Sequence, residues 1–150
     1  MSGGDLQVRS ATEDDFELIW QMYRDAVRPF VEPRLGRSWD DGEERDRFRH
    51  IWRPSESYVV TVGEDVIGWY AAMVTERRAA IHHFAIAEPH RRHGHATKLL
   101  SDLIHGWRSQ GKDVEASALK ESSLDALHRQ LGGHKTREEE LAVVVEWKRL

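Results

Sequence analysis

Apolar residues recur with two different periods on either side of a short basic turn in the second half of the chain. Residues 79–86 alternate between two faces, and a period of two predicts a strand; one face carries Ile81, His83 and Ala85, the other His82, Phe84 and Ile86. After Gly94 the apolar residues share one helix face, namely Ala96, Leu99, Leu100, Leu103, Ile104 and Trp107. The pattern therefore predicts a strand, a glycine-bearing turn and a helix that buries one face.

The same periodicities predict the other elements. Strands are expected at residues 6–9, 57–62, 66–74, 114–119 and 141–147, and helices after Thr12, over 40–52 and over 124–131. Thr12 should cap the first helix and Pro29 should end it, while Ser122 or Ser123 should cap the last.

Short connections make the strands between residues 57 and 86 antiparallel, and a helical crossover lets the strand 114–119 lie parallel to the strand 79–86. The sequence therefore predicts a mixed α/β sheet with helices on both faces.

Composition narrows the class of protein. The 150 residues suit one domain with its own core, which we expect to span residues 1–150. A net charge of −4 speaks against a general nucleic-acid binder, and the absence of Cys excludes disulfides and a thiol nucleophile. No run approaches the roughly 18 apolar residues of a membrane span, and the first residues lack the apolar centre of a secretory signal. These features predict a cytoplasmic protein without a membrane partner.

The turn 91–96 (RRHGHA) is locally positive, because no acidic residue occurs from residue 89 to residue 101. A helix start leaves about four backbone N–H groups unpaired and carries roughly half a positive charge, so a loop with Gly94 can wrap a pyrophosphate. Arg91 and Arg92 would add phosphate contacts. In the alternative interpretation, Gly94 only turns the chain and the arginines are solvated.

The pattern Arg91-x-x-Gly94-x-Ala96 resembles the Arg/Gln-x-x-Gly-x-Gly/Ala signature of the GNAT superfamily of N-acetyltransferases, in the same strand, turn and helix context. The likeness runs in order from residues 8–15 to residues 127–132. It implies an α/β GNAT fold, with a mixed, mostly antiparallel sheet of about six or seven strands and about four helices. In that fold two adjacent parallel strands splay apart and form the cleft for acetyl-CoA.

The resemblance also implies which residues bind acetyl-CoA, the acyl donor. The pantetheine arm would lie along Phe84, Ala85 and Ile86. The pyrophosphate would bind at the turn and helix start, on Arg91, Arg92, His93, Gly94, His95, Ala96 and Thr97, and Ser122 stands where relatives carry a further contact residue. A primary amine of a small molecule or peptide would attack the thioester directly, without a metal or a covalent intermediate.

Proton transfer is where the sequence departs from the resembled family. His128 stands at the usual position of a tyrosine acid, and Gly132-Gly133 replaces Gly-Phe. A histidine can donate to a leaving thiolate, since its reference pKa is about 6.5. The alternative is a polar residue on an exposed helix edge in a non-catalytic CoA-binding or protein-interaction module.

His83 is the preferred general base, with His82 close behind. Strand alternation places the two rings on opposite faces, so only one can serve. The alternative is that they are hydrogen-bonded within the sheet.

Three further features remain open from the sequence. Phe30, Glu32 and Trp39 are candidates for the wall of an acceptor pocket, or are simply packed in a loop. The histidines at 90, 93 and 95 flank the glycine expected to face phosphate, so a metal would compete with the cofactor and none is expected. The strand 141–147 could form the edge of a homodimer or close the sheet.

Overall fold

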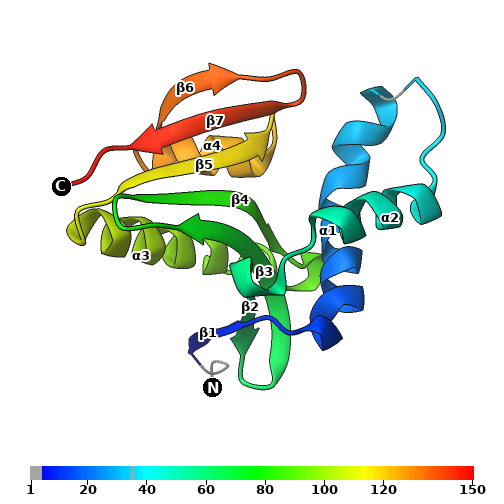
Figure 1. The fold of residues 1–150 in the computed structure, drawn as a ribbon, viewed down its shortest axis with the longest axis horizontal. Helices are drawn as coiled ribbons and strands as arrows, with labels where there is room; N and C mark the ends of the chain where they lie inside the picture. The colour runs from blue at the N-terminus through cyan, green and yellow to red at the C-terminus, as the bar shows by residue number, and fades with distance from the viewer. Residues whose placement is uncertain (1–4, 35) are drawn as a thin grey trace.

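One mixed sheet organises the protein. The computed structural model describes residues 5–34 and 36–150. In these residues the strands are β1 (Leu6–Ser10), β2 (Ser57–Val62), β3 (Asp65–Val74), β4 (Arg78–Ile86), β5 (Asp113–Leu119), β6 (His134–Glu138) and β7 (Ala142–Trp147), in the spatial order β1-β2-β3-β4-β5-β7-β6 (Figure 1). The helices are α1 (Phe16–Val31), α2 (Asp41–Ile51), α3 (His95–Ser109) and α4 (Ser123–Gln130). The predicted α/β fold is confirmed.

The two faces of the sheet bury separate apolar clusters. Helices α3 and α4 cover one face, where Leu100 and Val114 are fully buried. Helices α1 and α2 cover the other face, where Ile19 and Phe48 pack against Trp69 of β3. Helix α3 therefore buries the centre of the apolar stripe that its sequence predicted, at Leu99, Leu100 and Ile104.

Strand directions agree with the prediction. β2, β3 and β4 are antiparallel neighbours, and the crossover through α3 brings β5 parallel to β4. The parallel pairing covers only the first half of β4, where residues 78–81 face residues 113–116. Beyond these residues, β4 and β5 are no longer paired with each other.

A β-bulge in β4 overturns the predicted alternation. The register with β3 shifts between Ala71 and Ala72, so His83 faces Ala71 and Ile81 faces Ala72, and His82 is the extra residue. Ile81 consequently shares the α3 face with residues 84 and 86, and His83 lies on the α1 face. The prediction that Ile81 and His83 share a face was wrong, because a simple period of two cannot reveal an inserted residue.

Pro29 does not end the first helix as predicted. α1 continues to Val31, and the amide of Glu32 still donates to the carbonyl of Arg28. Pro29 lies in the last turn, where its missing N–H removes one helical hydrogen bond and the following amides keep theirs. The helix therefore tolerates the proline close to its end.

Side-chain caps begin three segments. Thr12 and Asp15 form a capping box, but it caps a short 3-10 turn and α1 begins only at Phe16. Asp40 and Ser122 cap α2 and α4, each accepting a hydrogen bond from the amide three residues later, at 2.9 and 3.1 Å. The choice between residues 122 and 123 is thereby settled for Ser122.

The edge strand β6 was not predicted, because all five of its residues are exposed and show no apolar alternation. It pairs with β7, which therefore lies between β5 and β6. Both edges of β7 are thus paired within the sheet, and β7 has no free edge for a second copy of the chain. Over residues 5–34 and 36–150, no helix has the length and apolar character needed to span a membrane.

Candidate functional site

An opening between β4 and β5 forms the first part of the site. Ser117 of β5 donates a hydrogen bond from Oγ to the carbonyl of His82 at 3.4 Å, at the point where the strands separate. The amide of Ala87 bonds back to β3, so the alternation along a strand turns the backbone groups of Phe84 and Ile86 away from β3 and toward the opening. Hydrogen-bonding groups therefore line one wall of the opening, while the backbone of Ala85 faces β3.

The helix start at the end of this opening has the geometry of an anion site. Gly94 is the N-cap of α3 and has φ +79°, a left-handed conformation that favours glycine. A Cβ built on Gly94 would meet no protein atom within 4 Å, so the space beside this backbone is free. The first N–H groups of α3 have no partner within the helix. Gly94 thus leaves room where a phosphate can approach these amides.

The charges around this helix start are positive. Arg91 donates from Nε to the carbonyl of Ile86 at 2.7 Å, which holds its side chain beside the opening. Neither Arg91 nor Arg92 forms an ion pair with a carboxylate of the described residues. His93, His95 and Thr97 lie on the same turn or first helical turn. The structure brings the predicted pyrophosphate residues together.

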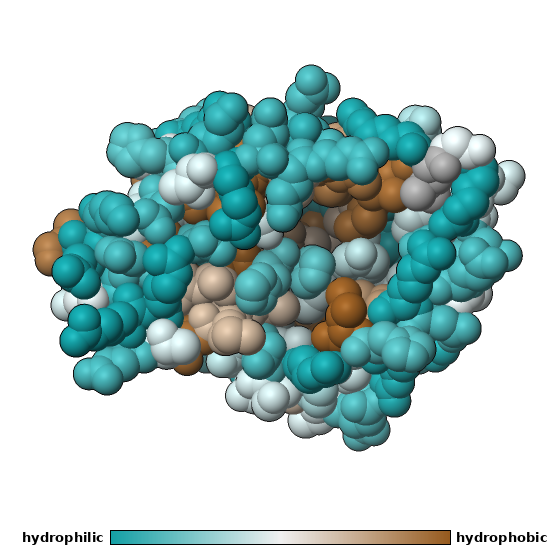
Figure 2. Space-filling view, turned by 45° about the horizontal axis from the view of Figure 1, so that its top comes forward, coloured by the Kyte–Doolittle hydropathy of each residue, from teal (hydrophilic) through white to brown (hydrophobic). Residues whose placement is uncertain are grey.

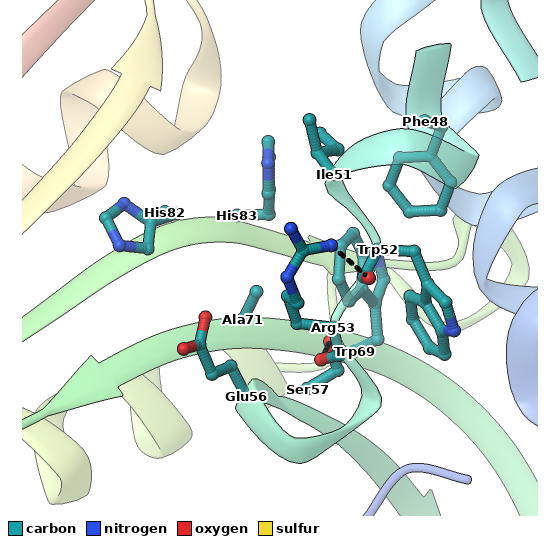
Figure 3. Close-up of a pocket in the computed structure, with 10 residues that line it drawn as sticks. All are labelled: Phe48, Ile51, Trp52, Arg53, Glu56, Ser57, Trp69, Ala71, His82 and His83. Carbon is teal, nitrogen blue, oxygen red and sulfur yellow. Dashed lines mark hydrogen bonds between the residues drawn. The ribbon is translucent and has the colours of Figure 1, made fainter. Parts of the chain in front are cut away.

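Behind the separating strands lies a pocket of about 290 Å³. It is built by the end of α2, the turn Pro54–Glu56 and the facing parts of β3 and β4, and is lined by Phe48, Ile51, Trp52, Arg53, Glu56, Ser57, Trp69, Ala71, His82 and His83 (Figure 3). Figure 2 shows one face of the molecule hollowed at its centre, with hydrophobic side chains inside and hydrophilic ones around the rim. The volume is close to the lower end of the roughly 300–1,000 Å³ typical of small-molecule sites.

Both candidate bases line this pocket. Figure 3 shows the rings of His82 and His83 projecting from β4 on the side of the pocket. The prediction that they point to opposite faces was wrong, because the bulge at His82 interrupts the alternation. The sequence argument for choosing only one of them therefore no longer applies.

His83 is the more enclosed of the two. Its ring stacks on Trp69 with centroids 5.6 Å apart and meets Tyr23 edge-on at 5.4 Å. Burial, with a smaller effect from neighbouring His82, lowers the pKa of His83 to about 4. The His83 ring is therefore neutral at pH 7. His82 is exposed at the pocket mouth.

His128 lies on the buried face of α4 rather than on an exposed helix edge. Its side chain is 1% exposed and meets Trp147 of β7 edge-on, with ring centroids 5.8 Å apart. Neither ring nitrogen has a hydrogen-bond partner among the described residues, and burial lowers the pKa to about 4 although Asp125 acts in the opposite direction. His128 is thus a neutral, enclosed imidazole.

The early loop does not contribute to the pocket. Trp39 is buried in the cluster between α1 and α2, and Glu32 pairs with Arg28. Phe30 belongs to α1, and none of these residues lines the pocket. Of the two interpretations that the sequence left open for Phe30, Glu32 and Trp39, the structure supports packing outside this pocket, whose wall comes from the end of α2, the turn after it, β3 and β4.

Sequence reasoning missed the residues that do form the wall, in particular Arg53 and Glu56. They stand in a five-residue connection between a helix and a strand, and nothing in its pattern marks it as functional. Pro54 is compatible with the end of a helix, but it does not indicate that the residues beside it line a pocket.

Comparisons with known proteins agree with this architecture. The model of the Acetyltransferase (GNAT) family matches residues 17–132. The fold is similar to that of an acetyltransferase from Thermus thermophilus (TM-score 0.73, 13% identity, 99% of both chains covered).

Two further solved structures are similar. The first is PaiA N-acetyltransferase from Thermoplasma acidophilum in complex with coenzyme A (TM-score 0.71, 10% identity, 96% of this chain and 99% of that chain). The second is the ribosomal-protein-S18-alanine N-acetyltransferase from Escherichia coli (TM-score 0.65, 14% identity, 97% and 94%). No curated protein sequence matches the chain.

Proposed function

The chain belongs to the GNAT family of acetyltransferases, and we propose that it transfers an acetyl group from acetyl-CoA to a primary amine of a small molecule or peptide by direct attack. The observation that carries this proposal is the position of His82. Its carbonyl lies where β4 and β5 separate, and its ring lines the pocket behind them. The opening and the pocket therefore meet at one residue, as a reaction between two bound molecules requires.

The residues around the opening fit a ligand with a diphosphate and an amide-bearing arm. The backbone of Phe84 and Ile86 would pair with the arm, and the amides after Gly94, together with Arg91 and Arg92, would bind the diphosphate. When bound, acetyl-CoA would supply a thioester carbonyl that is already activated toward an amine. The protein then has to position the two molecules and handle protons.

We propose that His83 and His82 act on the proton of the attacking amine. Burial lowers the pKa of His83 to about 4, so its ring is neutral at pH 7 but a weak base; it would accept the proton only transiently, directly or through water, as the amine attacks. His82, exposed at the pocket mouth, would pass that proton to solvent.

For the departing thiolate, the candidate is His128. Because its lowered pKa leaves the ring neutral at pH 7, His128 would donate a hydrogen bond rather than the proton of an imidazolium. Both nitrogens are enclosed, so this role requires the side chains around His128 to move. Unchanged turnover in a His128→Ala variant that still folds would remove it from the mechanism.

Release of thiol from acetyl-CoA, measured against a panel of primary amines and peptides with free amino termini, tests the proposal. Turnover with at least one amine is expected. Binding of CoA without turnover on any amine would contradict catalysis and favour a non-catalytic CoA-binding or protein-interaction module. The absence of CoA binding would contradict the proposal as a whole.

A further inference from the structure

Arg53 is an exposed residue that places a cationic group at the pocket. Its Nη1 donates to the carbonyl of Trp52 at 2.8 Å and to that of His50 at 3.1 Å, and within the described residues its Nε and Nη2 donate no hydrogen bond. Arg53 also takes part in no ion pair formed by the residues that the structure covers. Two of its donor groups thus remain available to a ligand.

The backbone that carries Arg53 is held in place. The carbonyl of Arg53 accepts hydrogen bonds from Oγ of Ser57 at 2.9 Å and from the amide of Glu56 at 3.0 Å. Pro54 follows directly and restricts the turn. The guanidinium is therefore anchored at one nitrogen on a fixed turn, which suits binding of a planar anion by the remaining donors.

A carboxylate of opposite charge lines the same pocket. Glu56 is three residues from Arg53, yet the two side chains form no ion pair, and Figure 3 shows Arg53 extending toward His83 while Glu56 lies to one side of it. A separated positive and negative group is complementary to a zwitterion, whose own charges would satisfy both.

The rest of the wall is largely apolar. Phe48, Trp52 and Trp69 form an aromatic floor, and Ile51, which is 54% exposed, adds an aliphatic surface at the end of α2. An exposed isoleucine beside an aromatic floor favours an acceptor with an apolar side chain.

We propose that the acceptor is a free α-amino acid with an apolar side chain. Arg53 binds its carboxylate, Glu56 attracts its ammonium group before deprotonation, and the amino group lies near the rings of His82 and His83. This inference rests on the proposed function and adds the class of substrate. An amine without a carboxylate leaves the guanidinium of Arg53 unpaired, and a peptide amino terminus places an amide where the carboxylate would bind.

The test compares three acceptors that share one side chain and differ beside the amine: L-phenylalanine, L-phenylalaninamide and 2-phenylethylamine. At saturating acetyl-CoA we expect kcat/KM for L-phenylalanine to exceed the other two by about 10- to 100-fold, as the loss of charge-assisted hydrogen bonds predicts. Arg53→Gln should lower kcat/KM for L-phenylalanine by a similar factor, mainly through KM, and should not lower it for 2-phenylethylamine, which has no carboxylate to lose. Arg53→Lys, which keeps the charge but not the planar fork, should restore part of the preference.

Arg77→Gln is the matched control, because Arg77 is exposed on the turn before β4 and does not line the pocket. Its kinetics should equal those of the wild type. Equal use of the three acceptors, or an equal effect of Arg53→Gln on all of them, would overturn the inference and leave the acetyltransferase activity standing.

Calorimetric binding of the same three compounds to the CoA-saturated protein gives a readout that does not depend on turnover. Tight binding of L-phenylalanine that is lost in Arg53→Gln, without acetylation of any amine, would support the amino-acid site and contradict the proposed activity. Undetectable or Arg53-independent binding of L-phenylalanine would overturn the inference.

Discussion

Replacing His128 by leucine tests the placement of this histidine in the core. The side chain is 1% exposed and neither nitrogen has a partner among the described residues. A buried polar group without a partner costs about 1–3 kcal/mol, and leucine has a similar volume without polar atoms. We therefore expect His128→Leu to raise the free energy of unfolding at pH 7 by about 1 kcal/mol or more.

The pH dependence of stability gives the second part of this prediction. The unfolded chain protonates a histidine near pH 6.5, whereas native His128 takes up a proton only near pH 4, so falling pH favours unfolding between these values. The full interval, at 1.36 kcal/mol per pKa unit, amounts to about 3 kcal/mol. His83 makes a similar contribution, because burial lowers its pKa in the same way. His128→Leu should therefore remove about half of the decrease in the free energy of unfolding that the two histidines cause as the pH falls.

Urea unfolding followed by tryptophan fluorescence at several pH values from 7 to 4.5 measures both effects. His105→Leu is the control, since His105 is exposed on α3 and the same substitution there removes a histidine that is not buried. A His128→Leu protein that is destabilised by more than about 2 kcal/mol and keeps the full pH dependence would refute the placement, because His128 would then be a hydrogen-bonded and useful core residue.

Two other regions give further predictions. Gly68→Ala should lower the free energy of unfolding by several kcal/mol in a thermal or urea melt, because its Cβ would lie 2.5 Å from the carbonyl oxygen of Ala85. Gly106→Ala, on open helix surface, should instead raise the free energy of unfolding by about 1 kcal/mol. Equal effects of the two substitutions would contradict this packing. If His83 is the base, its pKa of about 4 predicts that kcat/KM measured from pH 5 to 9 shows no inflection near pH 6.5. His83→Gln should lower kcat/KM across that range. An inflection near pH 6.5 that is retained in His83→Gln would assign the base elsewhere.

The sequence predicted most of the fold because its elements bury one face each. Apolar stripes identified α3 and the strands around it, and the cap of α4 was one of the two serines that the sequence offered. β6 escaped prediction since an edge strand exposed on both faces carries no apolar period. The end of α1 was misplaced because a proline in a last turn removes only one hydrogen bond.

The candidate site divides in the same way. The turn around Gly94 could be found from sequence, because its charge, its glycine and the following helix are contiguous. The pocket could not, since it joins the end of α2 to β3 and β4, and His82 and His83 both line it through the bulge at His82. A side chain such as Arg53 can be recognised as part of the pocket only when the fold places it beside these distant residues.

Calorimetric titration with coenzyme A tests the central claim that the start of α3 binds a diphosphate. Gly94→Leu and Gly63→Leu are a matched pair, because both glycines have positive φ and neither Cβ would meet a protein atom within 4 Å, but Gly63 lies in the β2–β3 turn. We predict that the wild type and Gly63→Leu bind coenzyme A equally, and that Gly94→Leu binds at least about tenfold more weakly. A wild type without affinity for coenzyme A, or a Gly94→Leu protein that binds it as tightly as the wild type, would contradict the account.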